Sequence, residues 1–303
     1  IIGPIEKDEG YDPNFSAAAN IATAPTGLLI PPSNVMITFS LVSGGTSVAA
    51  LFMAGYIPGA LWALACMLVV YICAKKAGYR SQTKLTGKEK FNAFIQALPC
   101  LLLIVIVIGG IIAGVFTATE GSVVAVVYSL LLSIYGYKSM KWKDLPEIFR
   151  ASAEMTGIII FLIGVSSIMS WVMAFTNIPT MVSNGLLSIS SNKYVILLMI
   201  NIILLVVGTF MDMTPATLIF TPIFLPVCTA LGMNTIHFGI MLIFNLCIGT
   251  ITPPVGTTLF VGVKVGGVKI ETVFKHLLPY FFAIIVVLML VTYIPQLSLW
   301  LPG

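Results

Sequence analysis

The residue of this sequence best placed for chemistry is Asp212, a carboxylate that directly follows the apolar run 194–211. A second apolar run is broken further along the chain, at 249–254 (GTITPP). An acid in hydrocarbon is costly unless it faces a partner or a water-filled cavity, and a broken helix leaves backbone carbonyls that need a partner as well. A bound cation satisfies both demands, as it does at the broken helices of secondary transporters. The pattern therefore indicates a cation site formed by these two stretches.

The composition is that of a polytopic, all-α membrane protein. Of the 303 residues, 58% are hydrophobic and 9% are charged, whereas a soluble domain carries roughly a quarter charged residues. The five cysteines lie in apolar runs without metal-ligand or disulfide spacing, so we interpret them as packing residues. The chain starts at Ile1 without a signal-peptide pattern, and we expect it to begin mid-protein.

Apolar runs and their breaks predict the elements that position the site. Runs long enough to cross a membrane predict spans at 49–74, 94–116, 121–137, 156–175 and 277–299. Two further runs, 14–42 and 236–263, each contain a Pro-Pro pair, and two successive prolines break a helix. We therefore expect broken helices there. The segment 178–190 is amphipathic and is predicted to lie at the interface.

Basic residues orient these spans. Fourteen of the 15 Lys and Arg residues lie in the stretches 6–13, 75–90, 138–150 and 264–276, and the remaining one is Lys193. Cytoplasmic loops carry such an excess, so these four stretches are predicted to be cytoplasmic. The chain is then outside at Lys193 and again near Gly232, which means that residues 194–230 enter and leave on one face. They are predicted to form a re-entrant helical hairpin with its tip, 212–215, near the bilayer centre.

An internal repeat relates the two parts of the chain at an offset of 222 positions. It superposes Pro4 on Pro226, Gly10 on Gly232, Gly27 on Gly249, Pro31-Pro32 on Pro253-Pro254 and Gly45 on Gly267. By the charge pattern the two broken helices run in opposite directions, so the repeat is inverted, and such repeats bind substrate and ions at discontinuous helices near the midplane.

The repeat also predicts the domain organisation. Residues 1–74 are interpreted as the C-terminal part of the first inverted repeat, 75–92 as a cytoplasmic basic loop, and 93–303 as the second inverted repeat. Roughly 130 residues of the first repeat, including its hairpin tip, are expected before Ile1.

Two other classes of protein fit the residues less well. A membrane enzyme needs paired carboxylates or a Ser/His arrangement at one depth, and the sequence offers Asp212 no such partner. A passive channel has no need of an inverted repeat with hairpin tips, which favours alternating access. We therefore predict a transporter that is not an enzyme, with no cofactor and no nucleic-acid partner.

Several motifs closely resemble the large membrane subunit of TRAP transporters. They are residues 208–216 (GTFMDMTPA), 221–223, Pro226, 237–239, 245–249, 252–256, 30–33, 116–120 and 293–295. The resemblance covers essentially the whole chain. It implies a sodium-coupled secondary transporter of the ion-transporter superfamily, in which the hairpins and broken helices move as an elevator against a scaffold.

The resemblance also implies a substrate class, partners and a location. Transporters of this kind take up organic acids, such as dicarboxylates, keto acids, sugar acids or sialic acid, across the bacterial inner membrane. They receive the acid from a periplasmic binding protein and work with a small four-helix membrane subunit, separate or fused. A stand-alone sodium/dicarboxylate symporter of the same superfamily is the nearest alternative, and transport without any binding protein would distinguish it.

The expected sodium ligands surround the hairpin tip and both breaks. They are Asp212, Thr214, Gly249 and Thr252 at one site, and Thr26 and Gly27 at a pseudo-symmetric second site. Sodium is a hard cation, and hydroxyl, carbonyl and carboxylate oxygens suit it. The alternative role for the carboxylate of Asp212 is to cap the helix that follows, and the alternative for the other residues is turn formation.

Residues beside the Pro-Pro pairs are expected to bind the substrate. They are Ser33, Asn34, Gly256 and Thr257. The half-helices beyond the prolines direct their positive N-termini toward the midplane, where a substrate carboxylate could sit. Glu120 is interpreted as a solvated turn residue and His237 as structural, and a GxxxG at 110–114 suggests close helix packing.

Overall fold

The computed structural model of the chain describes residues 2–79, 86–190 and 192–303 and is 81% helical, with no strand in those ranges. Seven of the helices found there are long and apolar enough to cross a membrane, or eight when the bent pair 13–29 and 34–42 is taken as one span. The predicted all-α polytopic membrane protein is confirmed. The chain divides into two compact units, residues 1–82 with 166–303, and residues 83–165.

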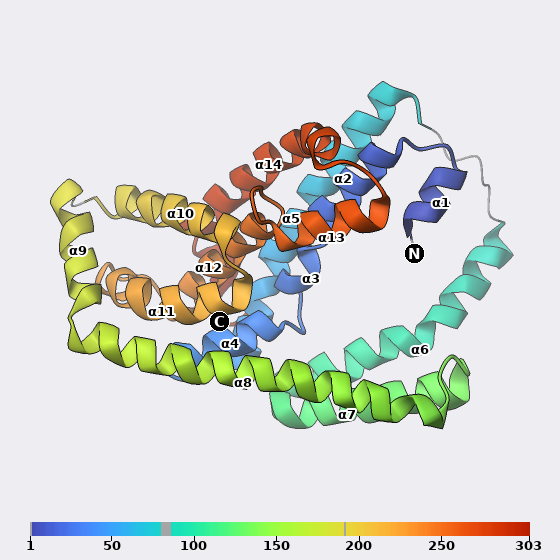
Figure 1. Cartoon of the computed structure of the whole chain (residues 1–303), viewed down its shortest axis with the longest axis horizontal. Coiled ribbons are helices and arrows are strands. Elements are labelled where there is room, and N and C mark those ends of the chain that lie inside the picture. Colours follow the sequence, from blue (N-terminus) through green and yellow to red (C-terminus); the bar gives the residue numbers. More distant parts are fainter. Residues whose placement is uncertain (1, 80–85, 191) are drawn as a thin grey trace. The chain divides into compact units, whose positions relative to one another are not determined.

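The larger unit contains both broken helices and the hairpin (Figure 1). Its helices are α1 (Ile2–Asp8), α2 (Pro13–Thr23), α3 (Thr26–Leu29), α4 (Asn34–Val42), α5 (Val48–Ala77), α9 (Ile178–Ile189), α10 (Lys193–Phe210), α11 (Met213–Ala230), α12 (Thr235–Thr250), α13 (Thr257–Gly266), α14 (Ile270–Tyr293) and α15 (Gln296–Leu299). The long helix α8 (Leu145–Phe175) passes from the smaller unit into the larger.

The first broken helix consists of three pieces. Asp12 caps α2, because its carboxylate accepts from the backbone N–H groups of Asn14 and Phe15. A single turn, α3, then separates α2 from α4, and the two halves are bent by 46°. The break at Pro31-Pro32 is matched in the second broken helix, between α12 and α13, and both Pro-Pro bonds are cis. The interruption predicted at 26–34 therefore includes one helical turn.

The hairpin is formed by α10 and α11, which are joined at Met211 and Asp212, and α12 packs against both arms (Figure 1). Each arm has 18 residues, which is about 27 Å of helix, so each would be long enough to cross a membrane alone. However, Lys193 at the start of α10 and Gly232 just after α11 line one pocket. The chain thus returns to the place where it entered, as the predicted hairpin requires.

Helix starts and packing match at the offset of 222. Helices α2 and α12 begin at Pro13 and Thr235, and α5 and α14 begin at Val48 and Ile270. At this offset α2 corresponds to α12, α4 to α13 and α5 to α14, and contacts in one repeat recur in the other. Helix α2 contacts α13 as α12 contacts α4, and α2 contacts α14 as α12 contacts α5. Left-handed glycines also pair, Gly10 (φ 84°) with Gly232 (φ 73°) and Gly45 (φ 93°) with Gly267 (φ 63°).

Three helices start well before the apolar runs that predicted them. Helix α6 (Gly87–Ile112) starts at 87 instead of 94, α8 at 145 instead of 156, and α14 at 270 instead of 277. Hydropathy marks the part of a helix that suits lipid, whereas polar residues form its exposed ends. At the start of α6, Thr86 and Glu89 make a capping box. Parts of the predicted basic loops are therefore helical, and residues 80–85 of the loop 75–92 lie outside the described residues.

The last predicted span ends earlier than expected, because Pro295 separates α14 from the short α15. In the smaller unit the span predicted at 121–137 is α7 (Ala118–Leu131), continued by a π-helical turn to Gly136. A short 3₁₀ turn, 142–144, precedes α8.

The turn between α6 and α7 explains two of the predicted motifs. The Glu120 carboxylate accepts from the Thr117 backbone N–H at 2.8 Å and from the Thr117 hydroxyl at 2.9 Å, which forms a capping box for α7. A Cβ at Gly110 would stand 2.7 Å from Cε1 of Phe116, and Gly114 has φ 70°. The GxxxG therefore shapes this turn by admitting the Phe116 ring, and it is not the helix-packing face that its pattern suggested.

Candidate functional site

The hairpin turn docks on the second helix break. The Val255 backbone N–H, in the break, donates to the Thr209 carbonyl at 3.1 Å, and the Thr257 hydroxyl donates to Oδ1 of Asp212 at 3.4 Å. Asp212 and Thr257 lie 45 positions apart in the chain, and the fold brings them together. The fold thus brings together two segments on which sodium and substrate residues were predicted separately.

Asp212 is the N-cap residue of α11, but its side chain makes no capping hydrogen bond. Its carboxylate is exposed, and its distance to the Thr257 hydroxyl is at the long end for a hydrogen bond. The positive end of the α11 dipole favours a negative charge at this position. The Asp212 side chain therefore lies at a helix end that suits an anionic group, and no backbone N–H group of α11 uses its oxygens.

Backbone oxygens gather at Gly256, the residue before α13. A Cβ built on Gly256 would stand 2.8 Å from the Thr252 carbonyl oxygen and 3.1 Å from the Thr250 carbonyl oxygen. The Thr252 hydroxyl donates to the Ile248 carbonyl at 2.6 Å, which leaves its oxygen lone pairs free to accept or to coordinate. Carbonyl and hydroxyl oxygens of this kind are the donors that hard cations prefer. A side chain at position 256 would collide with these oxygens, so glycine allows the backbone to pack closely against them.

Gly249 is required by close packing of two helices. A Cβ at Gly249 would stand 2.5 Å from Cα of Gly208 and nearer still to the Gly208 carbonyl. Helices α10 and α12 therefore cross in backbone contact here, which small residues permit. The Gly249 carbonyl accepts from the Thr252 backbone N–H at 3.0 Å. Thr214, the remaining predicted ligand, is half-buried in the first turn of α11.

The first break contributes two buried hydroxyls. Among the described residues, the Oγ1 of Thr26 and the Oγ of Ser33 are buried without a hydrogen-bond partner, and Ser33 as a whole is 2% exposed. Leaving a buried hydroxyl unpaired costs free energy, so these two atoms are the ones in the break best placed to bind a ligand. The predicted residues Gly27 and Asn34 are exposed in the same break.

The two breaks meet through a contact between repeat-related positions. The Cys247 thiol donates to the Pro25 carbonyl at 3.9 Å, and these two residues are 222 positions apart. Helix α4, which follows the first break, also packs on α11 of the hairpin. All ten predicted site residues therefore belong to one packed body, the larger unit.

A buried polar network escaped the sequence analysis. The amide of Asn245 in α12 donates to Oδ1 of Asn201 in α10 at 2.6 Å, and the amide of Asn201 donates to the Thr292 hydroxyl in α14 at 3.0 Å. All three side chains are at most 1% exposed. The signal that could have found them is a polar residue inside an apolar run, because such residues commonly hydrogen-bond across membrane helices.

His237 occupies a structural position. It is 3% exposed, and its Nε2 lies 2.8 Å from the Val291 carbonyl oxygen. A carbonyl can only accept, so Nε2 carries the proton and joins α12 to α14. The geometry fits the structural role expected from the sequence.

Comparisons with known proteins agree on one family. The model for "Tripartite ATP-independent periplasmic transporter, DctM component" matches residues 1–297. The chain is 52% identical over its full length to the uncharacterized protein YgiK of Salmonella typhimurium, covering 69% of that protein. It is 36% identical to the sialic acid TRAP transporter large permease protein SiaM of Vibrio cholerae, covering 98% of this chain and 69% of SiaM.

A third relative has another substrate in its name. The chain is 36% identical to the C4-dicarboxylate TRAP transporter large permease protein DctM of Pseudomonas aeruginosa, with 97% of this chain and 69% of that protein covered. These likenesses extend over both broken helices and the hairpin. The chain therefore belongs to the family of DctM components, the large permeases of tripartite ATP-independent periplasmic transporters.

Proposed function

We propose that this permease couples the uptake of an organic acid to sodium. Family membership makes the chain a transporter permease for solute uptake with a periplasmic binding protein. The observation that carries the sodium proposal is the Asp212 carboxylate, which is exposed at the hairpin turn and lies beside a helix break. Sodium bound there would meet carboxylate, hydroxyl and carbonyl oxygens from Asp212, Thr252 and the break around Gly256.

The substrate proposal rests on the half-helices beyond the breaks. Helices α4 and α13 start just after the two Pro-Pro pairs, so their N-terminal N–H groups are available to an anion. The buried Ser33 hydroxyl and the exposed Thr257 hydroxyl lie at these two helix starts. Relatives named for sialic acid and for C4-dicarboxylates both handle carboxylates, and we propose a carboxylate-bearing solute for this chain as well.

An elevator movement is the proposed mechanism. The hairpin is tied to the second broken helix by the Gly208–Gly249 crossing, the Val255–Thr209 hydrogen bond and the buried asparagine pair. These ties support movement of hairpin and broken helices as one body, with the site carried inside it. The matched helix starts and recurring contacts support the inverted repeat on which alternating access depends.

We propose that the chain lies in a bacterial inner membrane, where a permease of this family would receive its solute from a periplasmic binding protein. A small four-helix subunit, separate or fused, is the other proposed partner. The second candidate function is a stand-alone sodium/dicarboxylate symporter, which the same hairpin and breaks would serve. It differs in having no need of a binding protein.

Uptake into proteoliposomes tests these proposals. The complete transporter would be supplied with labelled sialic acid or succinate, with and without an inward sodium gradient and a periplasmic binding protein. Accumulation that requires both supports the proposed function. Accumulation with sodium alone identifies the stand-alone symporter, and accumulation that is equal without a sodium gradient contradicts the sodium coupling.

A further inference from the structure

Lys193 is the exception to the charge pattern of the chain. It is the only one of the 15 Lys and Arg residues outside the four predicted cytoplasmic stretches. It is half-buried at the start of α10. A lone cation on the face that is otherwise free of Lys and Arg is unexpected from the positive-inside rule. Its surroundings must therefore account for it.

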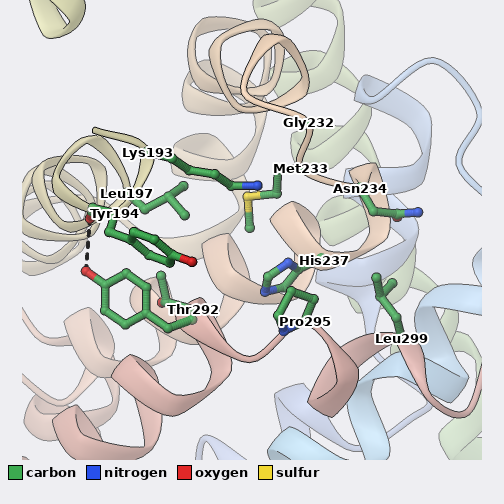
Figure 2. Close-up of a pocket in the computed structure, with 11 residues that line it drawn as sticks. Lys193, Tyr194, Leu197, Gly232, Met233, Asn234, His237, Thr292, Pro295 and Leu299 are labelled. Carbon is green, nitrogen blue, oxygen red and sulfur yellow. Dashed lines mark hydrogen bonds between the residues drawn. The ribbon is translucent and has the colours of Figure 1, made fainter. Parts of the chain in front are cut away.

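Lys193 lines a pocket of about 210 Å³ at one end of the helical body. The pocket gathers three chain segments: the start of α10, the turn between α11 and α12, and the end of α14 with Pro295 and α15. Figure 2 shows the Lys193 amine and the Tyr194 hydroxyl directed into the space between these segments. A cavity of this size holds several water molecules, so it has room for the charged end of a small organic molecule.

The lining has one formal charge and it is positive. None of the eleven lining residues is Asp or Glu, and in the described ranges the single salt bridge joins Arg150 to Glu154. Lys193 is half-buried and makes no ion pair within the described ranges, so its ammonium lacks the electrostatic interaction that a neighbouring carboxylate would supply. An anion in the pocket would restore that interaction.

Hydrogen bonds tie several residues of the pocket lining to neighbouring helices. His237 is held by its bond to the Val291 carbonyl, and Thr292 accepts from the buried amide of Asn201. One wall is fixed by the Tyr293 hydroxyl, which donates to the Tyr194 carbonyl at 3.1 Å. Leu197 and Met233 add apolar surface. The lining therefore combines hydrogen-bonded polar groups, one lysine and apolar side chains.

We propose that this pocket is a second anion site, in which the Lys193 ammonium and the Tyr194 hydroxyl bind the carboxylate or phosphate of a small organic anion. The apolar part of this anion would lie against the side chains of Leu197 and Met233. On the proposed function, the natural ligand is the transported acid at the outer face, before it reaches the helix breaks. A lipid phosphate headgroup presents the same chemistry, and the experiment separates the two sources.

The test is equilibrium binding to the purified complete transporter in phosphatidylcholine nanodiscs without sodium. The probes are labelled succinate, sialic acid and glycerol 3-phosphate, the last standing in for a headgroup. We expect sodium-independent binding that Lys193→Gln weakens roughly tenfold, as expected for a lost charge-assisted hydrogen bond. Lys193→Arg should retain most of the binding, and Tyr194→Phe should weaken it less than Lys193→Gln does. The matched control is Lys143→Gln, an exposed lysine in the smaller unit, which should leave binding unchanged.

The outcomes separate the sources and the two proposals. If phosphatidylglycerol in the nanodisc lowers binding of all three probes to the parent but not to Lys193→Gln, the site takes a lipid headgroup; if it has no effect, the site takes the free acid. Either result supports the anion site. The anion site is overturned if the parent shows no sodium-independent binding, or if Lys193→Gln binds the probes as well as the parent does. It is also overturned if Lys193→Gln has an effect only when the binding protein is present. Asp212→Asn should abolish sodium-dependent uptake and leave this binding intact, so the failure of one proposal is visible without the other.

Discussion

Helices α10 and α12 cross so closely that a single added methyl group should disturb the proposed cation site. Gly249→Ala would place a methyl group 2.5 Å from Cα of Gly208 and closer to its carbonyl. Carbon atoms in contact prefer about 3.5–4.0 Å, so the two backbones must separate by roughly 1 Å or more. The obstruction is backbone, which cannot rotate away as a side chain can. Overpacking of this kind costs about 1–3 kcal/mol.

The separation acts directly on the proposed cation site. The Thr209 carbonyl, one residue after Gly208, accepts from the Val255 N–H in the break, and Asp212 follows three residues later. If the contact of the hairpin turn with the second helix break is destabilised by about 1–3 kcal/mol, the equilibrium constant for forming that contact falls roughly 5- to 150-fold. We therefore expect Gly249→Ala to raise the sodium concentration for half-maximal uptake by a factor in this range and to lower the Tm of the purified protein.

Two alanine variants serve as graded controls. A Cβ at Gly208 would stand 3.2 Å from Cα of Gly249, and a Cβ at Gly109 in α6 would have nothing within 4 Å. The expected order of damage is Gly249→Ala, then Gly208→Ala, with Gly109→Ala neutral or slightly stabilising because alanine favours helix over glycine. The assays are thermal unfolding in detergent and sodium titration of uptake in proteoliposomes. A Gly249→Ala protein with the parent's Tm and sodium dependence would refute the crossing as a determinant of the site.

Three further predictions concern single polar groups. Asp212→Asn should insert normally but lose sodium-driven uptake, and unchanged sodium dependence would remove Asp212 from the site. Asn245→Leu leaves Asn201 without its buried donor and should lower the free energy of unfolding by about 1 kcal/mol; denaturant titration measures this, and equal stability would contradict it. Thr117→Val deletes the hydroxyl half of the capping box with Glu120 and should cost about 1 kcal/mol. Its effect should be confined to faster hydrogen exchange at the start of α7, with uptake unchanged.

Local chemistry made much of the architecture predictable. Pro-Pro pairs break helices wherever they occur, so the breaks at 31–32 and 253–254 were readable without tertiary information. The distribution of Lys and Arg predicted the hairpin over 194–230, with its turn at Asp212. The helix starts were less accurate, because the threonine and glutamate of a capping box extend α6 beyond its apolar run.

Pairings across the fold were not readable in the same way. Gly249 stands at a helix end, where glycine is an ordinary C-terminal signal, and nothing local shows that Gly208 presses against it. The contact of Asp212 with Thr257 and the network of Asn201, Asn245 and Thr292 join residues 44 to 91 positions apart. Periodicity assigns a residue to a helix but does not say which helix it will meet.

The proposed inverted repeat makes a geometric demand that these pairings meet. In a structure with a two-fold relation, an element can touch its own counterpart only beside the axis. Helix α5 packs on α14, and Cys247 contacts Pro25, each at the offset of 222. Pro25 immediately precedes Thr26, and Cys247 lies two residues before Gly249, so the axis must pass close to both breaks. On the proposed function, sodium and a carboxylate bound at the two breaks would then lie near one axis, where each could stabilise the binding of the other.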